Sequence, residues 1–252
     1  MRFMSMIHHW FGKQEGLPEH RILLAALPGV GNVGKLVVDS LIEANQNQLI
    51  LRLLHPAMPP QAKLDENGLL IPPAIEFHQI EDGLMVVTAE GQPMTPEGQH
   101  ECATEILSLA RDAGVEQVIV LAGMAAPAGE DDVFLVCSNS ANRVNLEGTG
   151  VDIRRDQPGG GVIGLAGLLS SMGPALGVNT SCAISTTVGA SVDPVAADRL
   201  FQAIASWFSL NTSPLGTILE RMATNRAILE TKGVVGEFSD VGKDDSAPML
   251  YS

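Results

Sequence analysis

Residues 21–43 read RILLAALPGVGNVGKLVVDSLIE and place an apolar run, a glycine-rich turn and a helical pattern in immediate succession. Residues 22–27 predict a strand buried on both faces, because the run is continuously hydrophobic and a Pro-Gly break ends it. From Val33 onward the apolar residues recur at helical spacing. A strand, a glycine loop and a helix in this order predict the opening unit of an α/β sheet.

The glycine loop fits a dinucleotide-binding fingerprint in part. Gly29, Gly31 and Gly34 match GxGxxG, with a strand before it and a helix after it. The fingerprint also needs an acidic residue at the end of the next strand, to bind the ribose. The next strand is predicted at residues 48–54, and the first acid beyond it is Asp65. This motif therefore lacks one of its functional parts.

The same loop nearly matches a phosphate-binding loop. Gly29, Gly34 and Lys35 fit GxxxxGK, but Leu36 stands where a serine or threonine would bind magnesium. Hydrolysis of a nucleoside triphosphate is therefore not expected. The loop, which includes Asn32, remains a possible anion or ligand site at a helix N-terminus, with Lys35 as the anion ligand. The structural alternative is that its glycines only let the helix pack closely on the sheet.

A second glycine-rich loop precedes a segment without charged residues. Gly159, Gly160 and Gly161 open residues 162–172, predicted as a helix, and residues 178–185, predicted as a strand. No charged residue occurs in residues 157–192, but Pro174 and polar residues divide this segment into pieces too short to span a membrane. Glycine loops of this kind bind ligands in α/β folds and also occur where backbones approach closely.

The rest of the chain alternates strand and helix patterns. Asp193 and Pro194 are expected to begin a helix whose apolar face includes Val195, and Asn67 and Gly68 predict the turn of a small hairpin. Further strands are predicted at residues 69–71, 75–79, 84–89, 117–121 and 133–137, and further helices at residues 96–113 with Thr95 as N-cap, 139–146 and 214–231. Residues 84–121 thus predict a strand, helix, strand unit with a parallel crossover.

Composition limits the classes of function. The 252 residues suit one α/β domain, placed at residues 21–231, with an N-terminal arm at 1–20 and a flexible tail at 232–252. The net charge of −14 argues against nucleic acid or an anionic membrane as a partner, since phosphate binding requires clustered Lys and Arg. No signal peptide is expected at the N-terminus, which favours a cytoplasmic protein.

Candidate metal and catalytic residues are few. Cys102, Cys137 and Cys182 are far apart and lack CxxC spacing, so we expect small buried hydrophobic residues in a reducing compartment. The acidic residues 130–132 are interpreted as a solvated turn. His8 and His9, which are next to each other in the N-terminal arm, are interpreted as solvated residues. We therefore predict no catalytic residue, no metal site and no cofactor.

Three segments together resemble the PAC2 family of proteasome assembly chaperones, in its archaeal branch. They are residues 27–36 (LPGVGNVGKL), 161–169 (GVIGLAGLL) and 193–204 (DPVAADRLFQAI). The resemblance extends over roughly residues 21–229. It implies a single α/β domain like that of the nucleoside phosphorylases, with a mixed, largely parallel central sheet flanked by helices. It also implies a homo-oligomer without established catalytic residues.

With this resemblance, the last residues of the chain acquire a role. Leu250, Tyr251 and Ser252 fit the HbYX pattern, a hydrophobic residue, a tyrosine and any residue at the C-terminus. In the family this pattern is associated with docking between α-subunits of the 20S proteasome core particle, where the terminal carboxylate meets a lysine and the tyrosine ring fixes the orientation. The expected function is a non-enzymatic proteasome-binding protein. The alternative is a phosphorylase-like or nucleotide-binding enzyme that uses residues 29–35.

Overall fold

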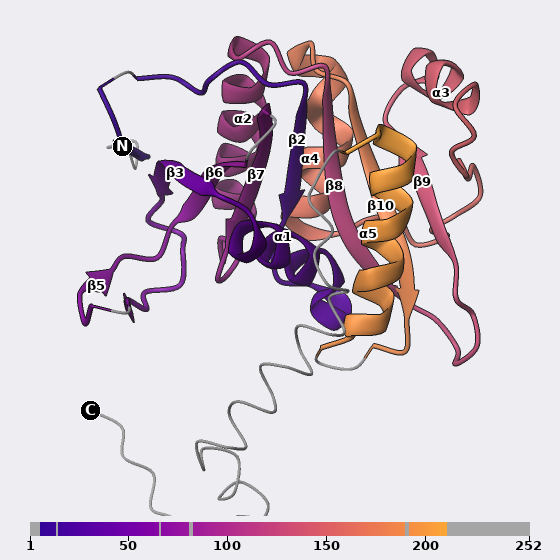
Figure 1. The fold of residues 1–252 in the computed structure, drawn as a ribbon, viewed down its shortest axis with the longest axis horizontal. Coiled ribbons are helices and arrows are strands. Elements are labelled where there is room, and N and C mark those ends of the chain that lie inside the picture. Colours follow the sequence, from indigo (N-terminus) through magenta and orange to yellow (C-terminus); the bar gives the residue numbers. More distant parts are fainter. Residues whose placement is uncertain (1–5, 14, 66, 81–82, 190–191, 211–252) are drawn as a thin grey trace, which may run out of the picture.

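The computed structural model describes residues 6–210, except residues 14, 66, 81–82 and 190–191. It confirms the predicted α/β class: Figure 1 shows a central sheet with helices on both sides. The helix predicted at residues 214–231 and the tail at residues 232–252 lie outside the described residues. Within the described part of the chain, no helix has the length and apolar character needed to cross a membrane.

The central sheet is mixed, with parallel strands in the middle. Its strands are β1 (Ile7–Trp10), β2 (Ile22–Ala26), β3 (Asn47–Leu54), β6 (Ile75–Ile80), β7 (Leu84–Ala89), β8 (Gln117–Ala125), β9 (Val133–Cys137) and β10 (Thr180–Thr187). They lie in the order β1-β3-β6-β7-β2-β8-β10-β9. Strands β7, β2, β8 and β10 run parallel, and the remaining pairs are antiparallel. The predicted parallel crossover from β7 to β8 is confirmed, with β2 inserted between these two strands.

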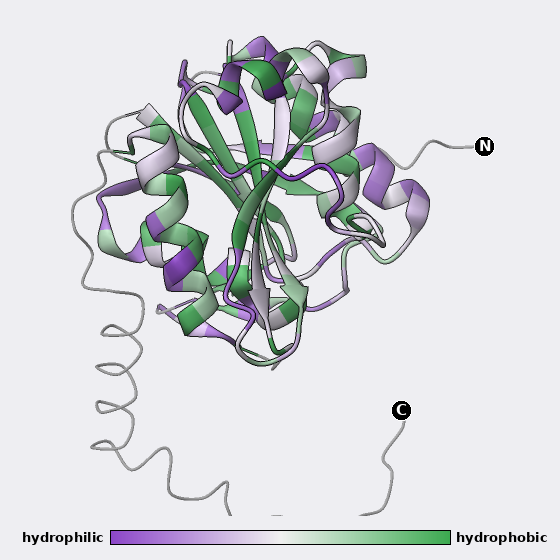
Figure 2. Cartoon of the chain, turned by 90° about the vertical axis from the view of Figure 1, so that its right-hand side faces the viewer, coloured by the Kyte–Doolittle hydropathy of each residue, from purple (hydrophilic) through white to green (hydrophobic). Residues whose placement is uncertain are grey.

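Helices cover both faces of this sheet. They are α1 (Val33–Ala44), α2 (Pro96–Asp112), α3 (Ser140–Glu147), α4 (Gly164–Met172) and α5 (Pro194–Phe208). Helices α1 and α5 pack together on one face, and α2 and α4 pack together on the other. Helix α3 lies beside β9 at the end of the sheet (Figure 1). In Figure 2, hydrophobic residues concentrate in the strands between these helix layers.

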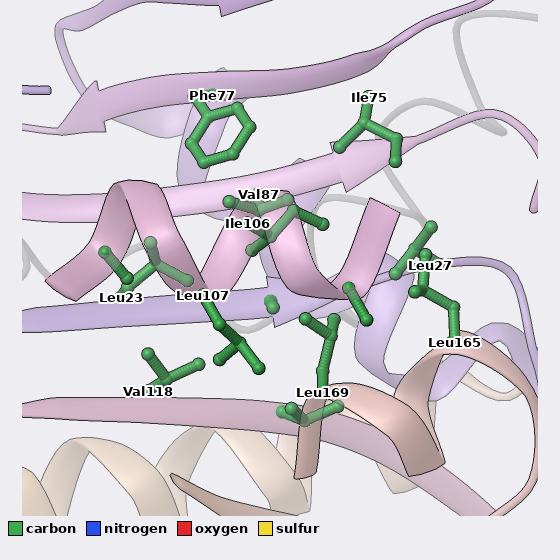
Figure 3. Packing of buried hydrophobic residues seen from close by; sticks show 14 of the residues in the cluster. Leu23, Leu27, Ile75, Phe77, Val87, Ile106, Leu107, Val118, Leu165 and Leu169 are labelled. Atoms are coloured by element: carbon green, nitrogen blue, oxygen red, sulfur yellow. The ribbon is translucent and has the colours of Figure 1, made fainter. Parts of the chain in front are cut away.

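The core is divided between the two faces of β2, as its continuous apolar sequence predicted. Leu23 and Leu24 point to opposite faces and are both fully buried. On the face of Leu23, Phe77 of β6 and Ile106 of α2 belong to the same cluster, and Leu169 of α4 closes it (Figure 3). Each fully buried side chain of this size contributes about 1.5–3 kcal/mol to the free energy of unfolding.

Two predicted helix starts are confirmed by their capping bonds. The Thr95 hydroxyl accepts a hydrogen bond from Gly98 N–H at 3.1 Å, and Pro96 occupies the first position of α2. The Asp193 carboxylate accepts one from Ala196 N–H at 3.0 Å at the start of α5. Both caps satisfy backbone N–H groups that have no partner inside the helix.

The apolar face predicted for α5 needs a correction. Val195 is 50% exposed, whereas Ala196 and Ala197 are fully buried against the sheet. The rest of the predicted face is confirmed, because Leu200, Ile204 and Phe208 are buried; only Val195, at its start, faces solvent. The small alanines let the first turn of the helix approach the sheet closely.

Within the predicted N-terminal arm, residues 7–10 form a strand of the sheet. Strand β1 pairs antiparallel with β3, from Ile7 opposite Leu54 to Trp10 opposite Leu51. The Trp10 side chain packs against the core cluster, and His8 Nε2 lies 2.6 Å from Glu105 Oε1 on α2. His8 is an exposed residue, as expected, and it also has a partner on α2.

Two further expectations concern strands. The predicted small hairpin is confirmed, with β4 (Lys63–Leu64) paired antiparallel to β5 (Leu70–Ile71), and it projects from the edge of the molecule in Figure 1. Strand β8, expected to end at residue 121, continues to Ala125, because β10 runs beside it as far as Thr187. The uncharged segment forms α4 and then β10, as predicted.

Candidate functional site

The first glycine loop turns from β2 into α1 at the carboxyl end of the sheet. A short 3₁₀ turn, Val30–Asn32, links the two elements, and Gly31 has φ = 62°. A Cβ atom on Gly34 would lie 2.2 Å from the Leu121 carbonyl oxygen of β8. On the opposite side of the contact, a Cβ atom on Gly123 would lie 2.2 Å from the Val30 oxygen. The loop and β8 therefore touch backbone to backbone, which supports the structural role considered for Gly34.

The loop is also fixed to the end of β10 and the start of α5. Asp193 N–H donates to the Gly31 carbonyl oxygen at 2.8 Å, and Thr187 Oγ1 donates to Asp193 Oδ2 at 2.6 Å. A Cβ atom on Gly31 would lie 2.9 Å from Thr187 Oγ1. Within the loop itself, Gly29 N–H donates to Asn32 Oδ1 at 3.3 Å. These bonds hold the loop in one conformation.

The structure brings part of the second glycine segment to the first loop. Gly161 and Gly164 line the same cavity of about 420 Å³ as Gly29 and Gly34. Gly159 and Gly160 do not line it; a Cβ atom on either would meet nothing within 4 Å. The paired glycine loops predicted from the sequence therefore meet, but only through the later residues of the second loop.

Gln92 connects the two loops, and sequence analysis missed it. Its Nε2 atom donates to the Pro28 carbonyl oxygen at 2.7 Å, and its Oε1 atom accepts from Leu165 N–H at 3.2 Å. The second bond caps the N-terminus of α4, where the N-cap residue Ile163 has no side-chain acceptor. The only sequence signal was an amide residue directly after the Glu-Gly that follows β7.

Lys35 does not take part in the cavity. Its Nζ atom lies 2.7 Å from Asp39 Oδ2 and 3.3 Å from Glu90 Oε1, and Lys63 forms a further ion pair with Glu90. Partial burial acts to raise the pKa of Glu90, but the hydrogen bond from Lys63 and the charges of Lys35 and Lys63 outweigh it and lower this pKa. The Lys35 ammonium is thus engaged by two carboxylates outside the cavity lining, which counts against its expected role as an anion ligand.

The dinucleotide interpretation fails on topology. The fingerprint requires the strand after α1 to lie directly beside the strand before it and parallel to it. Here α1 leads to β3, which β6 and β7 separate from β2, while the parallel neighbours of β2 are β7 and β8. The glycine spacing therefore matches the fingerprint without the sheet order that would place a ribose-binding acid beside it.

Other candidate residues behave as structural groups. Burial raises the pKa of the Cys102 and Cys182 thiols to about 12 and that of Cys137 to about 11, so none is an activated nucleophile. Asp131 pairs with Arg199, and Asp132 pairs with Arg154 at 2.9 Å. The part of the chain that the structure describes holds no group of three or more residues suited to bind a metal ion. Leu250, Tyr251 and Ser252 lie outside the described residues.

Comparison with known proteins gives a family and a set of similar folds. The family model described as PAC2 family matches residues 23–231. An uncharacterized protein of Methanocaldococcus jannaschii is 27% identical over 186 residues, which are 73% of this chain and 72% of the relative.

Solved structures share the fold over most of the chain. Pyrococcus furiosus PbaA, described as an archaeal homolog of proteasome-assembly chaperone, has a TM-score of 0.73 at 23% identity, covering 92% of this chain and 99% of PbaA. Pyrococcus furiosus PbaB, described as an archaeal proteasome activator, has a TM-score of 0.73 at 22% identity, covering 92% of this chain and all of PbaB (100%). A Mycobacterium tuberculosis proteasome-assembly chaperone homologue has a TM-score of 0.61 at 17% identity, covering 87% of this chain and 98% of that one.

Proposed function

The chain belongs to the PAC2 family, and from this premise we propose that it binds the 20S proteasome core particle as an assembly chaperone or activator, without catalysis of its own. The observation that carries the proposal is the shared fold: PbaA and PbaB, described respectively as a homolog of a proteasome-assembly chaperone and as a proteasome activator, each match more than nine-tenths of this chain. Two proteins with proteasome-related descriptions thus have the same architecture as this one.

The proposed contact is made by the C-terminal residues. Leu250, Tyr251 and Ser252 supply a hydrophobic side chain, an aromatic ring and a terminal carboxylate. In a pocket between α-subunits, the carboxylate forms a charge-assisted bond with a lysine and the ring fixes the orientation. We further propose that the protein is a homo-oligomer, because several weakly binding tails on one body gain affinity through their high effective concentration.

The geometry does not favour the phosphorylase-like or nucleotide-binding alternative. Lys35, the expected anion ligand of such an enzyme, is paired with Asp39 and Glu90. No described residue that lines the cavity between the two glycine loops is charged. A site for phosphate or nucleotide needs positive charge or several convergent donors at the anion. We therefore advance no enzymatic function.

Binding to purified archaeal core particle tests the proposal. Four proteins are compared in a pull-down and on a native gel: the chain as printed, a version lacking residues 250–252, Tyr251→Ala, and Ser252→Ala as the matched control. We expect the printed chain and Ser252→Ala to bind alike, because the last position of the motif accepts any residue. The truncated chain and Tyr251→Ala should bind at least tenfold more weakly.

Two results would contradict different parts of the proposal. Equal binding by all four proteins would place the interface on the folded body instead of the tail. If none of them bound core particle or isolated α-subunits, the proteasome would be excluded as the partner under those conditions.

A further inference from the structure

The cavity between the glycine loops lies where the connections of the sheet diverge. From β2 the chain passes through α1 to β3 on one side of the sheet, and from β8 it passes to β9 and β10 on the other side. In open α/β sheets, ligands bind in the crevice at the carboxyl ends of two adjacent strands whose connections diverge in this way. Strands β2 and β8 are adjacent and parallel, and residues that follow β2 and residues at the end of β8 line the cavity.

The cavity wall carries no charge. None of the described residues that line it is acidic or basic, and Gln92 is the polar side chain among them. Both polar ends of Gln92 already bond to the backbone, to Pro28 and Leu165. An anion placed here would lose its hydration without gaining a countercharge, which is strongly unfavourable. The lining therefore selects against phosphates, nucleotides and other charged ligands.

The cavity is apolar in its depth and too large for a packing defect. Leu27, Val33, Leu121 and Ile184 form part of its wall and are each less than 10% exposed. Protein interiors are packed as densely as organic crystals and contain few voids larger than a water molecule. A volume of about 420 Å³ lies within the range of small-molecule sites, about 300–1,000 Å³.

Apolar side chains also border the opening of the cavity. Ile163 is 84% exposed and Val30 is 42% exposed, although both contribute to the lining. A bound apolar molecule would remove part of this surface from water, which is favourable by about 25 cal/mol for each Å² buried. From location, charge, size and exposure together, we infer that this cavity binds an uncharged, predominantly apolar small molecule. This site is independent of proteasome binding by the tail.

Methyl NMR on the full-length protein tests the inference directly. Met124 lines this cavity, whereas Met58 lines a separate cavity of about 390 Å³ beside β7, so their labelled methyl groups report on the two sites separately. The probes are 1-hexanol, 1-octanol and cyclohexanol as neutral apolar molecules, and inorganic phosphate and ADP as anions. We expect a saturable shift of the Met124 methyl signal with at least one alcohol, little shift of Met58, and no shift of Met124 with phosphate or ADP.

Cavity-filling variants provide the matched control. Ala122→Leu on β8 and Ala166→Leu on α4 place a larger side chain in the lining, and each should weaken alcohol binding at least tenfold. Ala141→Leu makes the same change at an exposed position of α3 and should leave binding unchanged. Using two filling variants ensures that the misfolding of one does not decide the test.

Three outcomes would overturn the inference. One is a saturable shift of Met124 with phosphate or ADP, which would make the cavity an anion site. Another is alcohol binding that the filled variants retain, which would place the alcohols elsewhere. The third is the absence of any saturable Met124 shift across the three alcohols.

Discussion

Individual glycines show how closely the first loop is packed on the sheet. The sequence motif treats Gly29 and Gly34 alike, but their surroundings differ. A Cβ atom at Gly34 would overlap the Leu121 carbonyl, whereas at Gly29 the nearest atom would be Leu27 O at 3.8 Å. Gly29 has φ = −160°, an extended conformation open to any residue. Steric need therefore explains one of these glycines and not the other.

Gly34→Ala and Gly29→Ala form a matched pair for this difference. We expect Gly34→Ala to lower the free energy of unfolding by about 1–3 kcal/mol, because α1 must shift away from β8. This loss should exceed the stabilisation of about 1 kcal/mol that alanine gives over glycine through its higher helix propensity. Gly29→Ala should change stability by less than about 0.5 kcal/mol. Urea denaturation measures the stability of both variants. Equal losses would show that the close contact at Gly34 does not exclude a larger side chain.

At the residue scale, the sequence predicted the glycine loops but not how they are connected. Local spacing marks Gly31 and Gly34, because turn and packing glycines occur at fixed distances from a strand and a helix. Gln92 could not be found in this way. It bonds to Pro28 and Leu165, which are 64 and 73 residues away in the chain. A contact between such distant residues leaves no periodic signal in the sequence.

At the scale of elements, apolar runs identified most strands but not their neighbours. The continuous run at β2 correctly indicated burial on both faces, because every residue of β2 is buried. The insertion of β2 between β7 and β8 depends on the whole sheet and is not encoded in that run. Strand β1, with the sequence Ile-His-His-Trp, lacked an apolar pattern, since it is an edge strand with three exposed residues. Strand β1 is therefore defined by its hydrogen bonds with β3 and not by a pattern in its own sequence.

The start of α5 is the element boundary whose energetics can be tested most directly. Asp193 caps the helix through Ala196 N–H and accepts a hydrogen bond from Thr187. Partial burial acts to raise the pKa of Asp193, but these hydrogen bonds and the charge of Arg199 outweigh it, so this pKa is lowered. A lowered pKa in the folded state stabilises the protein at pH values above the unfolded-state pKa of about 3.9. The stabilisation is lost as the pH falls through the folded-state pKa.

We therefore expect Asp193→Ala to reduce the free energy of unfolding by about 1–2 kcal/mol at pH 7. Asp193→Asn, which keeps a carbonyl oxygen for the cap, should lose less. Below the folded-state pKa, the wild-type carboxyl group is neutral, so its difference from Asp193→Asn should shrink. Urea denaturation at pH 7 and in a series of acidic buffers measures these differences. A gap between the wild type and Asp193→Asn that stays constant with pH would rule out a contribution from the carboxylate charge.

At the scale of the whole molecule, exposed apolar side chains gather at one end. Among the large hydrophobic residues that the structure describes as exposed, most lie at the end of the sheet where the parallel strands have their carboxyl ends, in loops, in the β4–β5 hairpin or at the start of α5; they are Val30, Leu64, Leu69, Leu70, Met94, Ile163, Val188, Val192 and Val195. The uncharged segment at residues 157–192 contributes three of these nine residues. All charged residues therefore lie in the remainder of the chain.

The net charge of −14 leads to a prediction about the whole molecule. Repulsion among like charges destabilises a compact state. Salt screens this repulsion, and the Debye length falls from about 30 Å at 0.01 M to about 8 Å at 0.15 M. We expect the urea midpoint at pH 7 to rise with NaCl, mostly below about 0.15 M, and then to level off. Urea is uncharged, so the ionic strength can be set independently of the denaturant.

Salt also weakens ion pairs, which acts against the expected rise of the urea midpoint. Examples are Lys35 with Asp39 and Arg52 with Glu76, each at 2.7 Å. Partly exposed pairs of this kind contribute about 0–1 kcal/mol each. Measuring the urea midpoint against NaCl concentration near pH 4.7, the isoelectric point of the sequence, separates the screening of repulsion from the weakening of ion pairs. There the net repulsion vanishes, so the rise with salt should disappear while any loss from ion pairs remains. A midpoint that falls with NaCl at pH 7 would mean that the ion pairs outweigh the repulsion, and that the acidic surface is already balanced locally in the folded state.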